Sequence, residues 1–232
     1  MMLTLDHVDS FYGRSQALFD LHIEAPSESI YAILGRNGVG KTTLLRTILG
    51  LTDRSEGAIV LDGTNIAKLP THERAKAGVA YVPQGRHIIP DFTIRENILM
   101  GGFAASSGKR KIPDIVPELF PYLMENLDRQ GGLLSGGQQQ QLAIARALAA
   151  EPKILLMDEP TEGIQPNIVE QIEAAILRLN RELKLTILVV EQNVGFARRS
   201  ANAFAMIENG RAVAEGGIDG LTDDLVARHM TI

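Results

Sequence analysis

Cysteine is absent from this chain of 232 residues. Without cysteine the protein can form neither disulfides nor thiolate metal sites, and it is compatible with a reducing cytoplasm. No apolar run approaches the roughly 18 residues that a membrane-spanning helix needs. The N-terminus, "MMLTLDHVDS", meets an acidic residue before any apolar core forms, so we expect no signal peptide and a soluble, cytoplasmic protein.

Positive charge is also scarce. The chain has 23 Lys and Arg against 28 Asp and Glu, which gives a net charge of −5. Nucleic-acid binding as the main function is therefore disfavoured, because phosphate contacts need a basic face. The one basic run, "GKRK" at 108–111, lies among Ser and Gly and is expected to be a solvated loop.

Short apolar stretches alternate with segments of helical periodicity along most of the chain. Two Xaa-Gly pairs between apolar stretches, Asp62-Gly63 and Asn209-Gly210, indicate β-hairpins. Alternation of this kind, with apolar strands, predicts an α/β fold built on a mainly parallel sheet covered on both sides. The expected strands cover 3–8, 18–25, 29–34, 79–82, 153–158 and 185–191, and the expected helices cover 41–50, 139–150 and 167–183.

The helix expected over 167–183 carries an apolar stripe at three- and four-residue spacing. Such a stripe predicts that one face of the helix packs on the sheet. Its members are Ile168, Ile172, Ile176, Leu179 and Leu183.

The stretch "GRNGVGKT" matches the phosphate-binding pattern G-x-x-x-x-G-K-[ST] and lies between an apolar strand and a helix. Its glycines let backbone N–H groups converge on phosphate oxygens, and the helix adds the positive end of its dipole. The alternative, a glycine turn that only caps a helix, does not explain the full pattern. We therefore expect nucleotide contacts from Gly35, Arg36, Asn37, Gly38, Val39, Gly40, Lys41, Thr42 and Thr43.

Two carboxylates follow the apolar strand in "KILLMDEP". In open sheets, ligands bind at the carboxyl ends of the strands. Asp158 is expected to support Mg²⁺ together with the Thr42 hydroxyl, and Glu159 is expected to orient and polarise the water that attacks the phosphate. Taken alone, an Asp-Glu pair could also reflect the preference for acidic residues at a helix N-terminus.

A second glycine pair opens an apolar-striped helix in "LSGGQQQQLAIARAL". A serine cap followed by two glycines exposes backbone amides, which predicts a second anion-binding helix end. The expected site consists of Leu134, Ser135, Gly136, Gly137 and Gln138.

Four motifs occur in this order along the chain: "GRNGVGKT" at 35–42 (the P-loop), Gln84 in "YVPQ", "LSGGQ" and "LLMDEP". Through these motifs the chain resembles the ATP-binding subunit of ABC transporters over essentially its whole length. The resemblance implies a P-loop NTPase (RecA-like) core with an antiparallel N-terminal β-subdomain and a helical insertion. It implies a single ABC ATP-binding domain over 1–232. The nucleotide-binding core would be 1–84 and 141–232, and a mostly helical subdomain at 85–140 would end in the signature motif "LSGGQ".

The resemblance also implies roles for individual residues. Tyr12 in "SFYG" would stack on adenine, although taken alone it is better explained as a half-buried strand aromatic. Gln84 would sense Mg²⁺ and the γ-phosphate, and Lys41, Glu159 and Gln192 would serve catalysis. The loop from Gln84 to Pro90 is the expected coupling surface.

The partners implied are a second ATP-binding subunit, two membrane permease subunits and an extracytoplasmic solute-binding protein, with no nucleic acid. Two such subunits would pair head to tail, so that "LSGGQ" of one closes on ATP held by the other. The chain would then lie on the inner face of the membrane, attached through the permeases.

Two positions depart from the family pattern. Gln192 in "LVVEQN" stands where the family usually has a histidine that contacts the γ-phosphate. Ile164 in "TEGI" stands where an aspartate is usual, which weakens the expected contact across the dimer. We therefore expect the natural partner to be a different, complementary subunit.

The likeness extends to the subgroup that imports branched-chain amino acids and urea. "GRNGVGKT", the glutamine run and "TEGIQP" are most similar to the urea-type subunit, and the amino-acid importer is the alternative. More remote alternatives are an ABC ATPase outside transport and a nucleotide-binding module without hydrolysis, which the presence of Glu159 disfavours.

Replacing Gln192 with histidine should raise steady-state ATP turnover. A glutamine donates a hydrogen bond to phosphate but cannot carry the positive charge of an imidazolium. The measurement is phosphate release by wild type and the Gln192→His variant, and an unchanged or lower rate would contradict the expectation.

Overall fold

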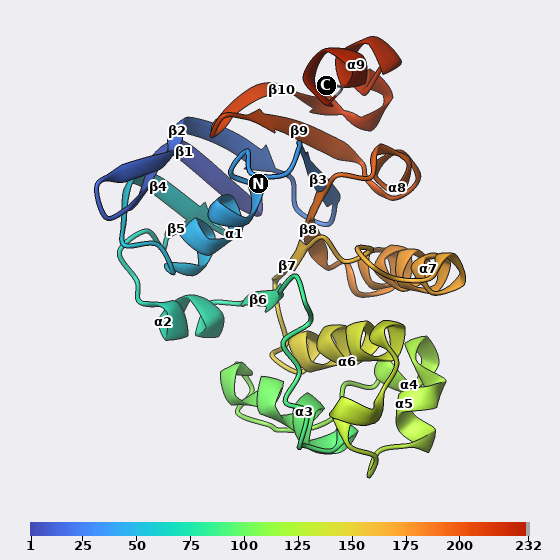
Figure 1. Cartoon of the computed structure of the whole chain (residues 1–232). Helices are drawn as coiled ribbons and strands as arrows, with labels where there is room; N and C mark the ends of the chain where they lie inside the picture. The colour runs from blue at the N-terminus through green and yellow to red at the C-terminus, as the bar shows by residue number, and fades with distance from the viewer. Residues whose placement is uncertain (231–232) are drawn as a thin grey trace.

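Two β-sheets organise the computed structural model, which describes residues 1–230 (Figure 1). The smaller sheet is antiparallel and has the strand order β2-β1-β4-β5. The expected strands near 3–8 and 18–25 are longer than predicted and form one hairpin. The bounds are β1 Leu3–Tyr12, β2 Ser15–Ala25, β4 Arg54–Leu61 and β5 Thr64–Asn65.

The larger sheet has the order β10-β9-β3-β8-β7-β6. Neighbouring strands are parallel except for β9 and β10, which form the hairpin expected at Asn209-Gly210. The predicted fold class is confirmed. The bounds are β3 Ile30–Leu34, β6 Val79–Val82, β7 Ile154–Asp158, β8 Thr186–Glu191, β9 Ala203–Glu208 and β10 Arg211–Gly217.

The parallel register aligns the carboxyl ends of the three central strands. Leu34 of β3 pairs with Glu191 of β8, and Val190 of β8 pairs with Asp158 of β7. The segments that follow these strands therefore leave the sheet at one edge, side by side.

The central strands are buried on both faces, because a separate apolar core covers each face. Tyr31 and Ile33 of β3 pack with the smaller sheet and with α1 (Lys41–Leu49). Ala32 and Leu34 point the other way, toward helices α6 (Gly136–Leu148), α7 (Pro166–Leu183) and α8 (Val194–Ser200). This two-sided burial explains why these strands are continuous apolar runs in the sequence.

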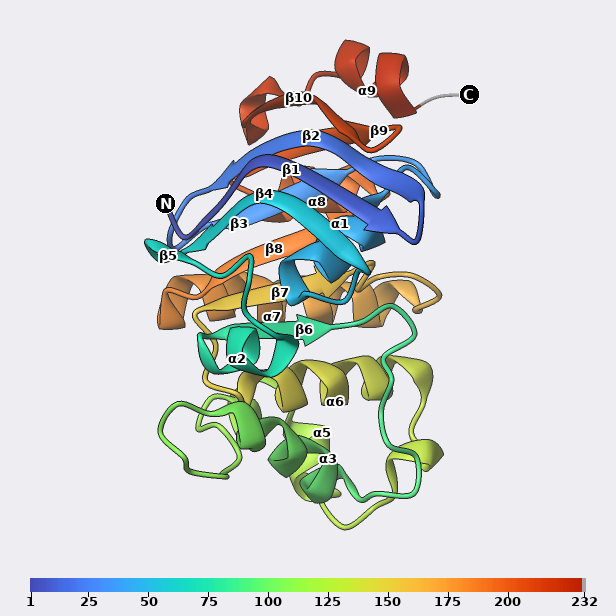
Figure 2. The same cartoon turned by 90° about the vertical axis from the view of Figure 1, so that its left-hand side faces the viewer.

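A helical region lies at the end of the molecule opposite α9 (Figure 2). Asn97 is buried there, and its amide bonds to the backbone of Ile89, Phe92 and Thr93, which anchors the irregular chain before α3. The helices of this region are α3 Ile94–Gly101, α4 Val116–Leu119 and α5 Pro121–Glu125, with short 3₁₀ turns at Gly102–Ala104 and Gly131–Leu133.

Three helices were not predicted from the sequence: α2 (Thr71–Lys76), α8, and α9 (Asp223–Met230), which follows a 3₁₀ turn at Ile218–Gly220. Within the described residues, no helix is both long and apolar enough to cross a membrane.

The predicted apolar stripe of α7 is found except at one end. Ile172, Ile176 and Leu179 are buried and Ile168 is half-buried, but Leu183 is 50% exposed. Leu183 is the last residue of α7, where the chain turns away into a left-handed Lys184. The prediction that Leu183 packs on the sheet was wrong.

Candidate functional site

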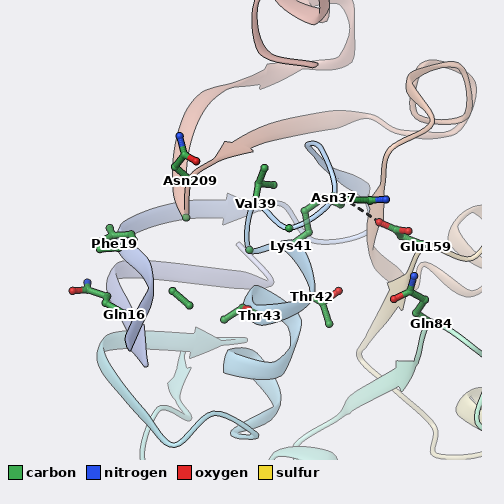
Figure 3. A pocket seen from close by; sticks show the side chains of 14 residues that line it. Gln16, Phe19, Asn37, Val39, Lys41, Thr42, Thr43, Gln84, Glu159 and Asn209 are labelled. Carbon is green, nitrogen blue, oxygen red and sulfur yellow. Dashed lines mark ion pairs between the residues drawn. The ribbon is translucent and has the colours of Figure 1, made fainter. Parts of the chain in front are cut away.

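A cavity of about 600 Å³ opens at the edge of the larger sheet where β3 and β7 end (Figure 3). It lies between the P-loop, the hairpin turn after β9 and strand β2. It is lined by Gln16, Ala17, Phe19, Asn37, Gly38, Val39, Gly40, Lys41, Thr42, Thr43, Gln84, Glu159, Asn209 and Gly210.

The P-loop backbone curls because two of its glycines have left-handed conformations, Gly38 with φ 80° and Gly40 with φ 110°. Helix α1 begins directly after, at Lys41, and no side chain caps its N-terminus. The first N–H groups of a helix lack partners within the helix and attract anions. This end of α1 is therefore free to receive a phosphate.

Lys41 is only 4% exposed, and its ammonium group has three acceptors close by. Nζ lies 2.8 Å from the carbonyl oxygen of Gly35, 3.0 Å from that of Arg36 and 3.1 Å from Oε1 of Glu159. An ammonium has three N–H donors. A phosphate that binds Lys41 must therefore displace one of these partners, and Glu159 is the one that faces the cavity (Figure 3).

Asp158 lies behind the P-loop and is 1% exposed. Its Oδ1 accepts a hydrogen bond from Thr42 Oγ1 at 3.2 Å, and its Oδ2 accepts one from the Tyr81 hydroxyl at 3.2 Å. Burial raises the pKa of Asp158, and the two hydrogen bonds oppose that rise. Tyr81, whose own pKa is also raised by burial, was not predicted as a site residue.

Glu159 has a left-handed backbone with φ 46°, which is costly for a residue other than glycine. Its N–H donates to the carbonyl of Val190 at 2.9 Å, so the strained residue is fixed to β8. Across the cavity edge, Gln84 Nε2 donates to Glu162 Oε2 at 2.6 Å. Glu159 thus contacts Lys41, and Glu162 contacts Gln84.

Gly35, Arg36 and Asp158 were predicted and do not line this cavity, although each bonds to Lys41 or Thr42 of its lining. Three further predicted elements do not line it either. Tyr12, at the end of β1, is half-buried and has the Arg46 guanidinium 5.7 Å from its ring centre. Gln192 is exposed at the end of β8. The motif 134–138 opens α6, where Ser135 caps the helix and forms a capping box with Gln138. The roles assigned to these residues remain predictions.

Gly137 of this motif lies in the first turn of α6, where α6 packs closely on α7. A Cβ atom at this position would lie 2.5 Å from Cγ2 of Ile168. Only a residue without a side chain allows the two helices to approach this closely.

The sequence did not indicate that the β9–β10 turn belongs to the cavity. The Gly210 N–H donates to the carbonyl of Val39 at 2.8 Å, and the Gly210 carbonyl accepts from the N–H of Phe19 at 2.9 Å. One turn thus connects the P-loop to β2. The remaining lining residues that were not predicted are Gln16, Ala17 and Asn209.

Comparison with known proteins agrees with this architecture. A family model described as ABC transporter matches residues 18–162. The branched-chain amino acid transport ATP-binding protein BraG of Pseudomonas aeruginosa is 41% identical over 213 residues, covering 91% of each chain. The probable branched-chain amino acid transport ATP-binding protein LivF of Archaeoglobus fulgidus is 36% identical and covers 96% of this chain and 94% of its own. This chain belongs to the ABC transporter family, as an ATP-binding subunit with ATPase activity.

Solved structures show the same fold. A nucleotide-free ATP-binding cassette of an ABC transporter superposes with a TM-score of 0.81 at 25% identity, covering all of this chain and 95% of its own. A dimeric cassette in a post-hydrolysis state, bound to ADP and Pi, gives a TM-score of 0.80 at 26% identity, covering 95% of this chain and all of its own.

Gly210→Ala should both destabilise the protein and weaken nucleotide binding. Gly210 has φ 75°, and a Cβ there would clash with the carbonyl oxygen of Ala17, so β2 or the P-loop must shift. We expect a loss of more than about 2 kcal/mol in the free energy of unfolding, and an ATP affinity lowered several-fold. Denaturant titration and nucleotide titration measure the two effects.

Gly63→Ala is a matched control, because the Asp62-Gly63 turn has nearly the same backbone as Asn209-Gly210. Gly63 has φ 76°, and a Cβ added to it would meet no other atom within 4 Å. Gly63→Ala should lower the free energy of unfolding by only about 1 kcal/mol, because alanine adopts a left-handed backbone less readily than glycine. Equal effects of the two substitutions would mean that the contact with Ala17 is unimportant.

Proposed function

We propose that this ATPase drives a membrane importer whose solute is urea. The observation that carries the ATPase part is that Lys41 and Glu159 pair at one cavity, while Asp158 is buried just behind it and bonds to Thr42 of the lining. Lys41 opens α1 after β3, and Asp158 and Glu159 lie at the end of β7, two strands away across β8. The three side chains lie around the uncapped start of α1.

Each of these side chains has a role that its position supports. Lys41 balances charge on the terminal phosphates once its bond to Glu159 is exchanged for them. Glu159, released from Lys41, then orients and polarises the attacking water. Backbone N–H groups of residues 37–43 hold the phosphates.

Mg²⁺ fits the side chains near the end of α1. Thr42 and Asp158 supply hard oxygen donors 3.2 Å apart, and Gln84 lines the same cavity. Within residues 1–230, no group of three or more His, Cys, Asp or Glu could hold a metal by itself. Such a sparse set suits Mg²⁺, which is bound by few protein ligands together with phosphate oxygens, and bound Mg²⁺ would neutralise charge on those oxygens.

A second subunit completes the proposed site. The motif 134–138 does not line the cavity of its own chain, so it is available to close on ATP held by a partner. One of the similar solved structures is a dimer. Ile164 in place of the usual aspartate supports a different, complementary partner chain rather than a second copy.

An apolar patch on the helical region is proposed to meet the permease subunits, which would hold the chain at the inner face of the membrane beside a solute-binding protein. Phe92, Met100 and Phe103 are 37%, 40% and 64% exposed and line one hollow of about 440 Å³. The patch lies close to the loop at 84–90. In that loop Arg86 and Ile88 are half-buried, which makes them less suited to direct contact than we expected from the sequence.

Two observations bear on the solute. The stretches "GRNGVGKT" and "TEGIQP" and the glutamine run favour urea. The names of BraG and LivF favour branched-chain amino acids, which is the second candidate. The site itself does not discriminate, because the residues around the cavity face the nucleotide and not the solute.

Uptake of labelled urea and labelled leucine, at low concentration in source cells with and without this gene, tests the solute. Loss of urea uptake alone is expected. Loss of leucine uptake alone would assign the chain to amino-acid import, with its ATPase chemistry unchanged.

Glu159→Gln should lower steady phosphate release at least about 100-fold, because general-base assistance is lost. ATP affinity should stay the same or rise, because the carboxylate that competes with phosphate for Lys41 is gone. Phosphate release and nucleotide titration measure the two effects. Glu182→Gln, which alters a surface pair with Arg178, is the matched control and should change neither. Retained turnover in Glu159→Gln would refute the assigned role.

A further inference from the structure

Glu191, the last residue of β8, is a buried carboxylate to which no role has yet been assigned. It is 3% exposed, and burial raises its pKa while hydrogen bonds oppose the rise. Among the described residues, every hydrogen bond that it accepts comes from a neutral donor. Burying a charged group costs free energy unless hydrogen bonds compensate, so this arrangement needs a reason.

The two carboxylate oxygens serve two different segments. Oε1 accepts from Thr161 Oγ1 at 2.8 Å and from Thr161 N at 3.3 Å, in the loop that begins at Glu159. Oε2 accepts from the backbone N–H of Gln192 at 3.2 Å and of Asn193 at 3.4 Å, in the turn before α8. Glu191 therefore joins segments that lie 30 residues apart in the chain.

Capping of α8 does not account for Glu191. Asn193 already caps this helix through a hydrogen bond from the Phe196 N–H to its Oδ1 at 3.0 Å. A carboxylate differs from other side chains in that both oxygens accept hydrogen bonds and neither donates. Such a group can accept from two sets of donors at once, and this is the arrangement found here.

The two joined segments carry the groups expected to act on the phosphate. Glu159 lies two residues before Thr161 and is itself fixed to β8 through the carbonyl of Val190. Gln192 follows Glu191 directly. Thr161 and Asn193 also line a common groove of about 770 Å³, so the two segments border the same hollow.

We propose that Glu191 is a positioning residue for ATP hydrolysis, whose carboxylate fixes the loop beginning at Glu159 relative to the turn that carries Gln192. The inference rests on the role proposed for Glu159 and on the phosphate contact predicted from the sequence for Gln192. A displacement of either segment is passed to the other through one planar group. Misplacement of a catalytic group by about 1 Å can lower a rate by up to about 100-fold.

Glu191→Gln tests the proposal with almost no change in shape. The amide has one acceptor oxygen and one donor nitrogen, so it cannot accept from both segments. We expect kcat to fall about tenfold. KM for ATP and the nucleotide affinity should stay within about twofold of wild type, and the melting temperature within a few degrees. The measurement uses the full chain purified with the subunits that accompany it.

Thr161 provides a second, independent test. Thr161→Val keeps the side-chain volume but removes the hydroxyl, and it should lower kcat as Glu191→Gln does. Thr161→Ser keeps the hydroxyl and should restore most of the rate. Asp114→Asn, which removes an exposed ion pair with Lys111, is the control and should leave kcat unchanged.

A double-mutant cycle separates positioning from general stability. If Glu191 acts through Gln192, then Gln192→Ala should cost less in the Glu191→Gln background than in wild type. Additive effects, wild-type rates in Glu191→Gln and Thr161→Val, or a loss explained wholly by weaker ATP binding or unfolding would each overturn the proposal.

Glu159→Gln, measured alongside, distinguishes the two levels of inference. An inactive Glu159→Gln with a fully active Glu191→Gln overturns only the positioning role. An active Glu159→Gln overturns the proposed chemistry, and the positioning role with it.

Discussion

The site depends on the parallel register of β3, β8 and β7. Because Leu34 pairs with Glu191 and Val190 with Asp158, the P-loop, the acidic pair and the Gln192 turn leave the sheet at the same edge. Each segment contributes little alone. Together they surround the start of α1 with an ammonium group, two carboxylates and free backbone amides. The central strands are buried on both faces, so a slip of one residue would exchange the side chains of the two cores and disrupt the packing of both.

Within this frame, the buried charged groups have partners in the protein itself. Lys41 is neutralised by Glu159 and by two carbonyl groups, and Asp158 is held by a threonine and a tyrosine hydroxyl. The cavity is thus preorganised, and nucleotide binding exchanges partners rather than creating buried charge. Such an exchange limits the free energy lost to desolvation on binding.

Much of this could be predicted from the sequence because the signals are local. The P-loop pattern, the residues after the strand at 153–158 and the Ser135 cap are each defined within a few positions. The β9–β10 turn could be predicted as a turn, but its place beside Val39 follows from the strand order, in which β9 lies next to β3. Tyr81 and Glu191 were missed for a similar reason, since their partners are distant in the chain. The error at Leu183 arose because helical periodicity does not show where a helix leaves the sheet.

The close approach of α6 and α7 also constrains how the sequence can change in evolution. Gly137 has no room for a side chain because Ile168 fills the space above it. The sizes of these two residues are therefore linked, although 31 positions separate them. The two positions should therefore vary together in evolution. Replacement of Gly137 by a larger residue requires that Ile168 is first replaced by a smaller one. The order of such changes is not free, because the reverse path passes through a steric clash.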